Sequence, residues 1–233
     1  APTDIQLLVT QPPDAAPACA GADILTEVVF AMGSPNPLII AAVPSGAAFI
    51  WDAATGALLS RSACQPAAVT PLSSAQSHTT PALALNGTLA VFAVGAAATV
   101  VAWDITNPTA PAVAWSWSPP GAANGTAAAY PTFTAEPIAS ADGASLFVVL
   151  DGVMYALDAA TGRALWTVAS PDPRGLFHTA ALDDGAGLVY GFTAYNPLLD
   201  GDDNGGYGVL LVAVDVGSGA IMWSAEAWDP NVL

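Results

Sequence analysis

The sequence predicts an all-β fold, a β-propeller of four four-stranded antiparallel blades with an additional strand at the N-terminus. Two observations predict it. A motif built around an aspartate occurs four times, at steps of 52, 54 and 57 residues, and short apolar runs bounded by turn residues flank each copy. The composition agrees, because 54% of the 233 residues are hydrophobic and only 9% are charged, which excludes a disordered chain. The length suffices to bury a core.

Each copy of the motif ends an apolar run on an aspartate and continues through a short turn. The four aspartates are Asp52, Asp104, Asp158 and Asp215. In the third copy the turn reads Ala-Ala-Thr-Gly and leads into a run that contains Trp166. Aspartate and threonine side chains hydrogen-bond to backbone groups within turns, and glycine accepts a positive φ. We therefore expect the aspartates to shape turns, and Trp115, Trp166 and Trp223 to pack between neighbouring blades.

Further apolar runs in front of each aspartate complete four strands per repeat. In the third repeat they are residues 136–140 and 145–150, separated by a turn that contains Ala-Asp-Gly. Sets of four hairpin-connected strands are typical of propeller blades. We expect an N-terminal strand and proline-rich leader at residues 1–21, a propeller at 22–227 and a C-terminal tail at 228–233. The expected blades are approximately residues 22–68, 76–118, 130–170 and 176–227.

The segment from Tyr155 to Trp166, Tyr-Ala-Leu-Asp-Ala-Ala-Thr-Gly-Arg-Ala-Leu-Trp, resembles the tryptophan-docking repeat of the quinoprotein (PQQ-like) β-propellers. The resemblance spans about residues 22–227, is specific at this repeat and is good from Asp215 onward. It is partial elsewhere: Ser60 takes the tryptophan position in the first repeat, and three extra residues precede the tryptophans of the second. It implies a propeller of PQQ-like repeats, of the branch that uses them as a non-catalytic scaffold.

Catalysis with a quinone needs more than this repeat. In quinoprotein dehydrogenases, which the chain resembles in blade architecture, the resemblance implies about eight blades, adjacent cysteines over the quinone and a calcium near a catalytic aspartate. Here Cys19 and Cys64 lie 45 residues apart and four repeats are present. His78 and His178 occupy equivalent places in the repeat, which explains them without chemistry. We therefore expect no enzyme, no catalytic residue and no organic cofactor.

One acidic loop has the spacing of calcium ligands. Asp200, Asp202 and Asn204 place side-chain oxygens at positions 1, 3 and 5, and Gly206 follows. Ca²⁺ prefers carboxylate and carbonyl oxygens at such close spacing. Position 12 is Leu211, where an EF-hand has a bidentate glutamate. Two interpretations stay open: a calcium loop, and a solvated hairpin between the second and third strands of the fourth blade.

Several features indicate a secreted, extracellular protein. Asn86-Gly-Thr and Asn124-Gly-Thr are N-glycosylation sequons, although Asn-Gly is also a common hairpin turn. Cys19 and Cys64 are compatible with one disulfide bond or with a pair of thiols. The chain begins at Ala1 with no signal sequence, as expected of a processed product. No apolar run has the length of a membrane span.

The charge balance excludes several partners. The chain has three arginines, no lysine and a formal net charge of −16, so it will not hold nucleic acid or an anionic membrane by charge. Schiff-base and P-loop chemistry need a lysine and are excluded. With so few charges, the surface is either unusually apolar or covered by N-glycans and neighbouring molecules.

These observations favour a non-catalytic extracellular structural glycoprotein that polymerises with copies of itself into a filament or a surface layer. The strand at residues 4–10 can cover a sheet edge within its own molecule or add to a sheet edge of the next molecule, and the second possibility makes it the expected link. A head-to-tail contact that does not close generates a filament. Two alternatives stay open: a secreted module that binds a ligand or calcium, and half of a quinoprotein-like dehydrogenase.

Overall fold

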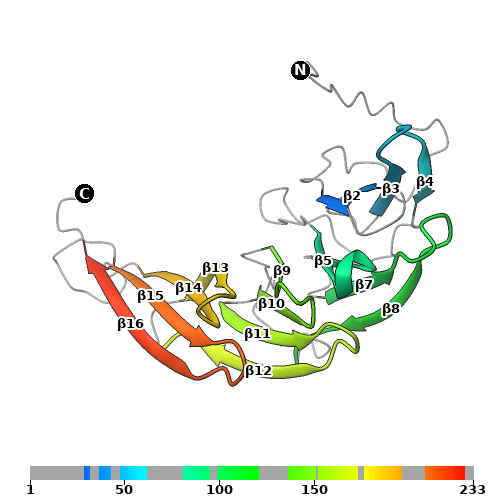
Figure 1. The fold of residues 1–233 in the computed structure, drawn as a ribbon. Coiled ribbons are helices and arrows are strands. Elements are labelled where there is room, and N and C mark those ends of the chain that lie inside the picture. Colours follow the sequence, from blue (N-terminus) through cyan, green and yellow to red (C-terminus); the bar gives the residue numbers. More distant parts are fainter. Residues whose placement is uncertain are drawn as a thin grey trace, which may run out of the picture.

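The structure, a computed structural model, describes nine stretches of the chain, and these are almost entirely β-sheet. The described residues are 29–31, 37–42, 48–61, 81–94, 99–120, 136–150, 152–172, 176–195 and 208–228. They form four separate four-stranded antiparallel sheets, with a 3₁₀ turn, η2, at Leu85–Gly87. Figure 1 shows the sheets as successive blades. The predicted all-β propeller fold is confirmed.

Each blade is a meander of four strands in chain order. Blade 1 consists of β1 (Val29–Ala31), β2 (Leu38–Ala42), β3 (Ala48–Asp52) and β4 (Leu58–Arg61). Blade 2 consists of β5 (Ala82–Ala84), β6 (Leu89–Val94), β7 (Thr99–Asp104) and β8 (Ala112–Trp117). Blade 3 consists of β9 (Ile138–Ala139), β10 (Ser145–Leu150), β11 (Val153–Asp158) and β12 (Ala164–Ala169). Blade 4 consists of β13 (Leu176–Asp183), β14 (Leu188–Tyr195), β15 (Gly208–Asp215) and β16 (Ile221–Trp228). The strand expected at residues 4–10, with the leader and the tail, lies outside the described residues.

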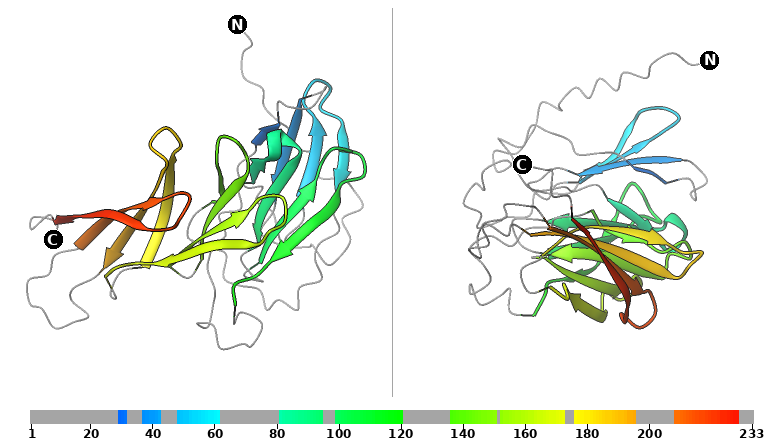
Figure 2. Two further views of the ribbon diagram at one scale, coloured as in Figure 1. Left: turned by 60° about the horizontal axis from the view of Figure 1, so that its bottom comes forward. Right: turned by 90° about the vertical axis from the view of Figure 1, so that its left-hand side faces the viewer.

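The four blades follow one another along an open arc. Figure 1 shows blade 1 at one end of the arc and blade 4 at the other, and the left view of Figure 2 shows the same order. In each blade the fourth strand lies on the outer side of the arc, and the first strand lies on the inner side. The two ends do not meet, so among the described residues blade 1 and blade 4 each stack against one neighbouring blade.

The core lies between the blades. Apolar side chains of one sheet pack against the facing sheet of the next, because this is how a sheet removes its faces from water. Between blades 3 and 4 the cluster joins Phe147 and Met154 to Phe177 and Val212, all of them 0% exposed. Strand β10, which has a blade on each side, is buried at five of its six positions. Each blade therefore completes the core of its neighbours.

A register shift occurs at the same place in every blade. The pairing of the third and fourth strands slips between Ile50 and Trp51, Ala102 and Trp103, Ala156 and Leu157, and Ala213 and Val214. A bulge of this kind bends the strand and re-aims its side chains. In blades 2, 3 and 4 it leaves a tryptophan of the fourth strand directly opposite an alanine of the third. These pairs are Trp115 and Ala102, Trp166 and Ala156, and Trp223 and Ala213.

Candidate interaction surface

The repeat aspartates act within their own turns. The Oδ1 atom of Asp158 accepts the backbone N–H of Thr161 at 2.8 Å and its hydroxyl at 2.7 Å. Asp215 does the same with Ser218, at 2.8 and 2.6 Å. Equivalent bonds join Asp52 to Thr55 and Asp104 to Thr106. The turns of blades 1, 3 and 4 then close through a glycine with positive φ, namely Gly56 and Gly162 at 70° and Gly219 at 72°.

These hydrogen bonds lower the pKa of all four repeat aspartates below the ordinary value of 3.8. The hydroxyl of Thr161 is the largest cause for the pKa of Asp158, and the backbone N–H of Thr55 is the largest cause for that of Asp52. A carboxylate with a lowered pKa remains ionised at neutral pH and is poorly matched to general acid–base chemistry there. The geometry of these aspartates is that of turn formation.

Two of the predicted docking tryptophans cross from one blade to the next. The indole Nε1 of Trp115 in blade 2 donates to the backbone carbonyl of Ala159 in blade 3, at 2.8 Å. The Nε1 of Trp166 in blade 3 donates to the carbonyl of Val216 in blade 4, also at 2.8 Å. In both cases the acceptor is the residue that directly follows the repeat aspartate. Each tryptophan therefore binds the turn of the following blade.

The glycine of that turn lies directly beneath the indole. A Cβ on Gly162 would lie 2.5 Å from the six-membered ring of Trp115, and a Cβ on Gly219 would lie 2.7 Å from Cγ of Trp166. Both distances are shorter than real Cβ contacts, so a side chain cannot be added without movement of the ring. The turn is thus a socket for a tryptophan, formed by a carbonyl and a bare glycine.

The interface between blades 1 and 2 is built differently. Blade 1 has Ser60 at the tryptophan position, opposite Ile50, where the other blades pair tryptophan with alanine. The residue after the repeat aspartate in blade 2 is Ile105, which is 3% exposed and packs with Ile50 and Leu59. A bulky residue in the turn thus accompanies a small residue in the preceding blade. Where the turn has Ala159, the preceding blade supplies Trp115.

Neighbouring blades are also joined through their hairpins. Oδ2 of Asp184 in blade 4 accepts the N–H of Ala141 in blade 3, at 2.9 Å. The N–H of Leu85 in blade 2 donates to the carbonyl of Gly143 in blade 3, at 3.2 Å. The bond to Ala141 gives the Asp184 carboxylate a structural role between blades.

The third tryptophan, Trp223, lies on a sheet face that no described blade covers. Residues directly opposite on neighbouring strands share a face, and Tyr190, Ala213 and Trp223 form one such row across β14, β15 and β16. The rings of Tyr190 and Trp223 lie 5.9 Å apart between centroids. Phe192 and Leu211 form the adjacent row. We call Tyr190, Phe192, Leu211 and Trp223 the open face of blade 4.

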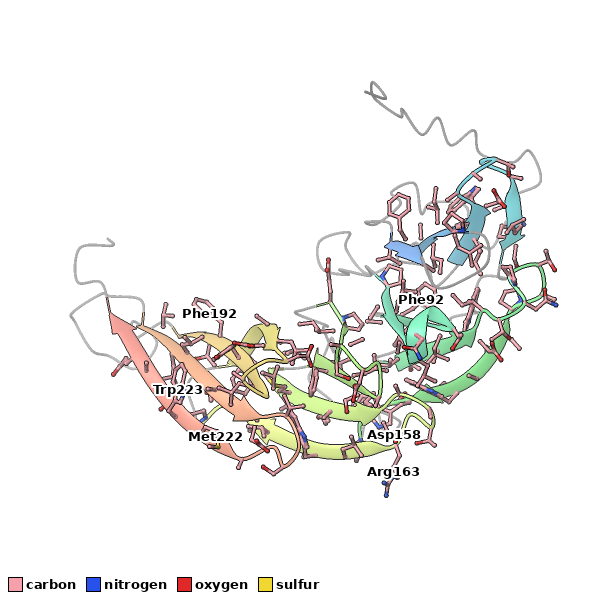
Figure 3. The ribbon with its side chains drawn as sticks, in the orientation of Figure 1. Phe92, Asp158, Arg163, Phe192, Met222 and Trp223 are labelled. Atoms are coloured by element: carbon pink, nitrogen blue, oxygen red, sulfur yellow. The ribbon has the colours of Figure 1, made fainter. Side chains whose placement is uncertain are left out.

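The open face is apolar and exposed. Phe192, Leu211 and Trp223 are 36%, 37% and 42% exposed. Figure 3 shows Phe192 and Trp223 on blade 4, at the end of the arc away from blade 1. Met222 beside them is 58% exposed. A cluster of exposed aromatic and aliphatic side chains of this kind marks an interaction surface.

The remaining predicted site residues are placed as follows. Asn86 is exposed in η2, with a positive φ of 57°. The second sequon residue, the cysteine pair, His78 and the proposed calcium ligands lie outside the described residues; these are Asn124, Cys19, Cys64, Asp200, Asp202, Asn204 and Gly206. His178 lies in β13.

The described stretches contain no group of three or more histidine, cysteine, aspartate or glutamate side chains that could hold a metal ion. Within the same stretches no helix has the length and apolar character needed to cross a membrane. The turn aspartates, which are the most regularly spaced acidic residues of the chain, are thus not gathered into a metal centre by the fold.

The sequence does not reveal the part of the turn that each tryptophan contacts. The carbonyls of Ala159 and Val216 and the glycines Gly162 and Gly219 each contact a tryptophan of the preceding blade, whereas the motif predicts only a turn at these places. The packing of Ile105 in place of the tryptophan that blade 1 lacks is not evident from the motif either. A signal was present in the pairing of residue sizes, because the repeat without a tryptophan is followed by the only repeat with isoleucine after its aspartate.

Comparisons with known proteins identify relatives of this architecture. The family model PQQ_2, described as outer membrane protein assembly factor BamB, matches residues 47–232. No curated protein matches the chain. Among the solved structures that match is the crystal structure of BamB from Moraxella catarrhalis, with 18% sequence identity and a TM-score of 0.48, covering 88% of this chain and 62% of that one. The chain thus spans about 62% of the length of this solved relative.

Proposed function

The chain belongs to the PQQ_2 family, whose model is described as outer membrane protein assembly factor BamB, and from this premise we propose that it is a non-catalytic protein-interaction module of a larger assembly. Membership of the family confirms the resemblance to PQQ-like propellers noted in the sequence. The name of the family model supports a role in bringing proteins together, and a propeller fold alone leaves the function to its surfaces.

The exposure of the open face of blade 4 is the observation that carries the proposal. Its side chains are of the kinds enriched in protein interfaces, aromatic and aliphatic residues without charge. Phe192, Leu211 and Trp223 are each more than a third exposed. Soluble proteins seldom leave such clusters uncovered unless a partner binds there.

The turn chemistry supports the absence of catalysis. The repeat aspartates, which come nearest to a periodic set of catalytic carboxylates, direct their Oδ1 atoms to the amides and hydroxyls of their own turns. A general base must instead direct its free oxygen toward a substrate. The chemistry of this module is therefore that of surface contact.

The finer features of the proposal concern the compartment and the surface coat. A location outside the cytoplasm, where the family model's name also points, suits the sequons at Asn86 and Asn124 and the cysteine pair. We propose an extracellular protein that carries glycans there and assembles with copies of itself. Intact-mass measurement of material from its natural source, with and without glycosidase and reductant, reads out glycans and a disulfide directly.

A photo-cross-linking experiment tests the interaction function. Benzoylphenylalanine replaces Leu211 on the open face, and in a matched chain it replaces Leu165 of β12, which is 44% exposed on blade 3. The chains are irradiated in the cells that produce them and the adducts are identified by mass spectrometry. We expect a defined protein adduct from position 211 and none from position 165. Equal labelling from both positions, or adducts that contain no protein, would contradict the function.

A further inference from the structure

We propose that Asn86 is a site of spontaneous chemical modification, at which its side-chain amide is lost as ammonia, and that the junction between blades 2 and 3 controls the rate of this reaction. Asn86 lies in η2, the turn between β5 and β6. The inference goes beyond the proposed function and does not depend on it.

The turn between β5 and β6 has a left-handed backbone. Leu85, Asn86 and Gly87 have φ angles of 49°, 57° and 79°. In the described stretches, Leu85 and Asn86 are the only residues other than glycine with a positive φ. Residues with a side chain rarely adopt this conformation, and leucine is less suited to it than asparagine. A strained turn of this kind persists only where its surroundings hold it in place.

Blade 3 holds the turn at Leu85. The N–H of Leu85 donates to the carbonyl of Gly143, in the turn between β9 and β10, at 3.2 Å. The two backbones lie so close together that a Cβ on Gly143 would be 2.5 Å from the Leu85 nitrogen. The Leu85 side chain also packs against the core cluster that blades 2 and 3 share, which includes Leu89 and Leu146. The junction between the two blades therefore maintains the left-handed turn.

Thr88 closes the turn from within blade 2. Its backbone N–H donates to the carbonyl of Leu85 at 3.2 Å, and its hydroxyl donates to the same carbonyl at 2.7 Å. Leu85 is thus bonded at its N–H to blade 3 and at its carbonyl to Thr88. The Thr88 side chain is exposed, so its hydroxyl can be removed by substitution without a change to the core.

Asn86 and Gly87 contain all the protein groups that the reaction needs. The backbone nitrogen of Gly87 attacks Cγ of Asn86, the bond from Cγ to the amide nitrogen breaks, and ammonia leaves with the proton of the Gly87 N–H. Water then opens the five-membered imide: cleavage at Cγ gives aspartate, and cleavage at the main-chain carbonyl gives isoaspartate. Glycine has no side chain that would obstruct the attack, and asparagine is among the thermally labile residues. Asn86 is exposed, so water reaches the imide.

The left-handed backbone keeps the two reacting atoms apart. In the imide, the Gly87 nitrogen and Cγ of Asn86 belong to one five-membered ring, so the nitrogen must lie on the same side of the Cα–C bond as Cβ. Asn86 has a ψ of 34°. Because N and Cβ are about 120° apart around a tetrahedral Cα, the Gly87 nitrogen lies nearly opposite Cβ at this ψ. The attack therefore requires a rotation of ψ that takes Asn86 out of the turn.

Rotation of ψ at Asn86 is coupled to the junction between the blades. It moves the peptide groups on both sides of Asn86, and these are linked to Gly143 through the Leu85 N–H and to Thr88 through the Leu85 carbonyl. The reaction therefore proceeds from molecules in which this part of the junction has opened locally. Its rate in the folded chain is the rate of the open turn multiplied by the fraction of molecules that are open.

The isoaspartate product cannot return to the original turn. Its main chain passes through Cβ and Cγ and is one atom longer, so Leu85 and Thr88 no longer meet in the same geometry. A molecule that has opened and reacted thus keeps a weakened contact between blades 2 and 3. We expect this product to melt about 2–4 °C below the unmodified chain. Asn86→Gly, which accepts the positive φ and has no amide, should keep its melting temperature after the same incubation.

Peptide mass spectrometry of the incubated full chain tests the proposal. The chain is produced in a host that adds no N-glycans and is kept at mildly alkaline pH, folded in buffer or unfolded in guanidinium chloride. We expect Asn86 to react at least about tenfold more slowly in the folded wild type than in the unfolded chain. Gly143→Ala, whose Cβ displaces the Leu85 backbone, and Thr88→Val, which removes the hydroxyl bond, should each raise the folded rate at least about threefold. Each variant is compared with its own unfolded rate, which removes differences in intrinsic reactivity.

Gly56→Ala is the matched control for Gly143→Ala. Gly56 has a φ of +70°, against +68° for Gly143, and a Cβ there would meet nothing within 4 Å, so the variant has similar backbone strain and leaves the β5–β6 turn untouched. Its rate at Asn86 should equal that of the wild type. Three results would overturn the proposal: no reaction of Asn86 in guanidinium chloride, equal rates in the folded and unfolded wild type, or an unchanged rate in both Gly143→Ala and Thr88→Val when circular dichroism shows them folded.

Discussion

Blades 3 and 4 have an aromatic residue, an alanine and a tryptophan in the corresponding row of one face. This face is buried in blade 3 and exposed in blade 4. In blade 3, Phe147 and Met154 are 0% exposed, because blade 4 covers them. Their counterparts in blade 4, Tyr190 and Leu211, face solvent, and Leu211 is 37% exposed. The two blades share the order of their strands and the bulge between their third and fourth strands, although the strands of blade 4 are longer. The burial of a blade face therefore depends on whether another blade packs against it.

Removing the tryptophan from each face should give the largest difference in the free energy of unfolding between the two blades. We expect Trp166→Ala to lower the free energy of unfolding by about 3 kcal/mol, because it empties part of the core between blades 3 and 4 and leaves the carbonyl of Val216 unpaired. Trp223→Ala should cost less than about 1 kcal/mol in the monomer. Urea unfolding at submicromolar concentration measures both values. Equal losses would show that the two faces are equally covered in solution.

The socket glycines give the next largest contrast. Gly219→Ala places a Cβ 2.7 Å from Trp166, at a φ of +72°, and should cost about 3 kcal/mol through overlap and backbone strain together. Gly56→Ala meets only the strain at φ +70°, with nothing within 4 Å, and should cost about 1 kcal/mol. Thermal and urea unfolding of the two variants distinguish these values. A Gly56 variant as damaging as the Gly219 variant would mean that its turn is occupied within the monomer.

Acid should affect blades 3 and 4 to a similar extent, because in both turns the repeat aspartate accepts a backbone N–H and a hydroxyl. The folded chain lowers the pKa of Asp158 and Asp215 below 3.8. The stabilisation is therefore complete above the unfolded pKa and is lost as the pH falls through the lowered folded pKa. Asp158→Asn and Asp215→Asn keep an acceptor oxygen and remove the titration. Relative to wild type, each should reduce the fall in Tm below about pH 4 by a similar amount; a markedly larger effect at one site would contradict the equivalence of the turns.

The smallest expected effect concerns Thr193, on the side of β14 that faces blade 3. It is 0% exposed, and its hydroxyl has no hydrogen-bond partner among the described residues. Replacing a buried hydroxyl without a partner by a methyl group removes a desolvation cost. Thr193→Val should therefore raise the free energy of unfolding by about 1 kcal/mol. Thr167→Val, at an exposed position of β12, is the control and should change it by less than about 0.5 kcal/mol.

The fold was predictable because its signals are local and repeated. Asp158, Thr161 and Gly162 form their turn from side chains within five residues of one another, so their spacing alone identifies the turn. The repeat then fixes how many blades to expect. The four aspartates and the strands around them needed no information about distant residues.

The candidate surface was only half predictable. Trp166 and Trp223 have similar sequence surroundings, and both were expected to pack between blades. Among the described residues a blade lies beyond Trp166 and none lies beyond Trp223, and the presence of a neighbour depends on the arrangement of all the blades. Gly56 and Gly162 likewise occupy the same place in the same turn of the sequence, yet among the described residues a Cβ would meet a tryptophan ring at Gly162 and nothing within 4 Å at Gly56. This difference comes from the long-range arrangement of the blades, which no local sequence pattern contains.

The position of the core between blades has a consequence for the growing chain. Met154 and Phe147 of blade 3 are fully buried only when Phe177 and Val212 of blade 4 lie against them, and these come later in the sequence. During synthesis, one apolar face of each newly formed blade therefore stays exposed until the following blade has left the ribosome. The exposed face of the last blade to form is a site for aggregation or for chaperone binding. As translation proceeds, this site moves from each blade to the next.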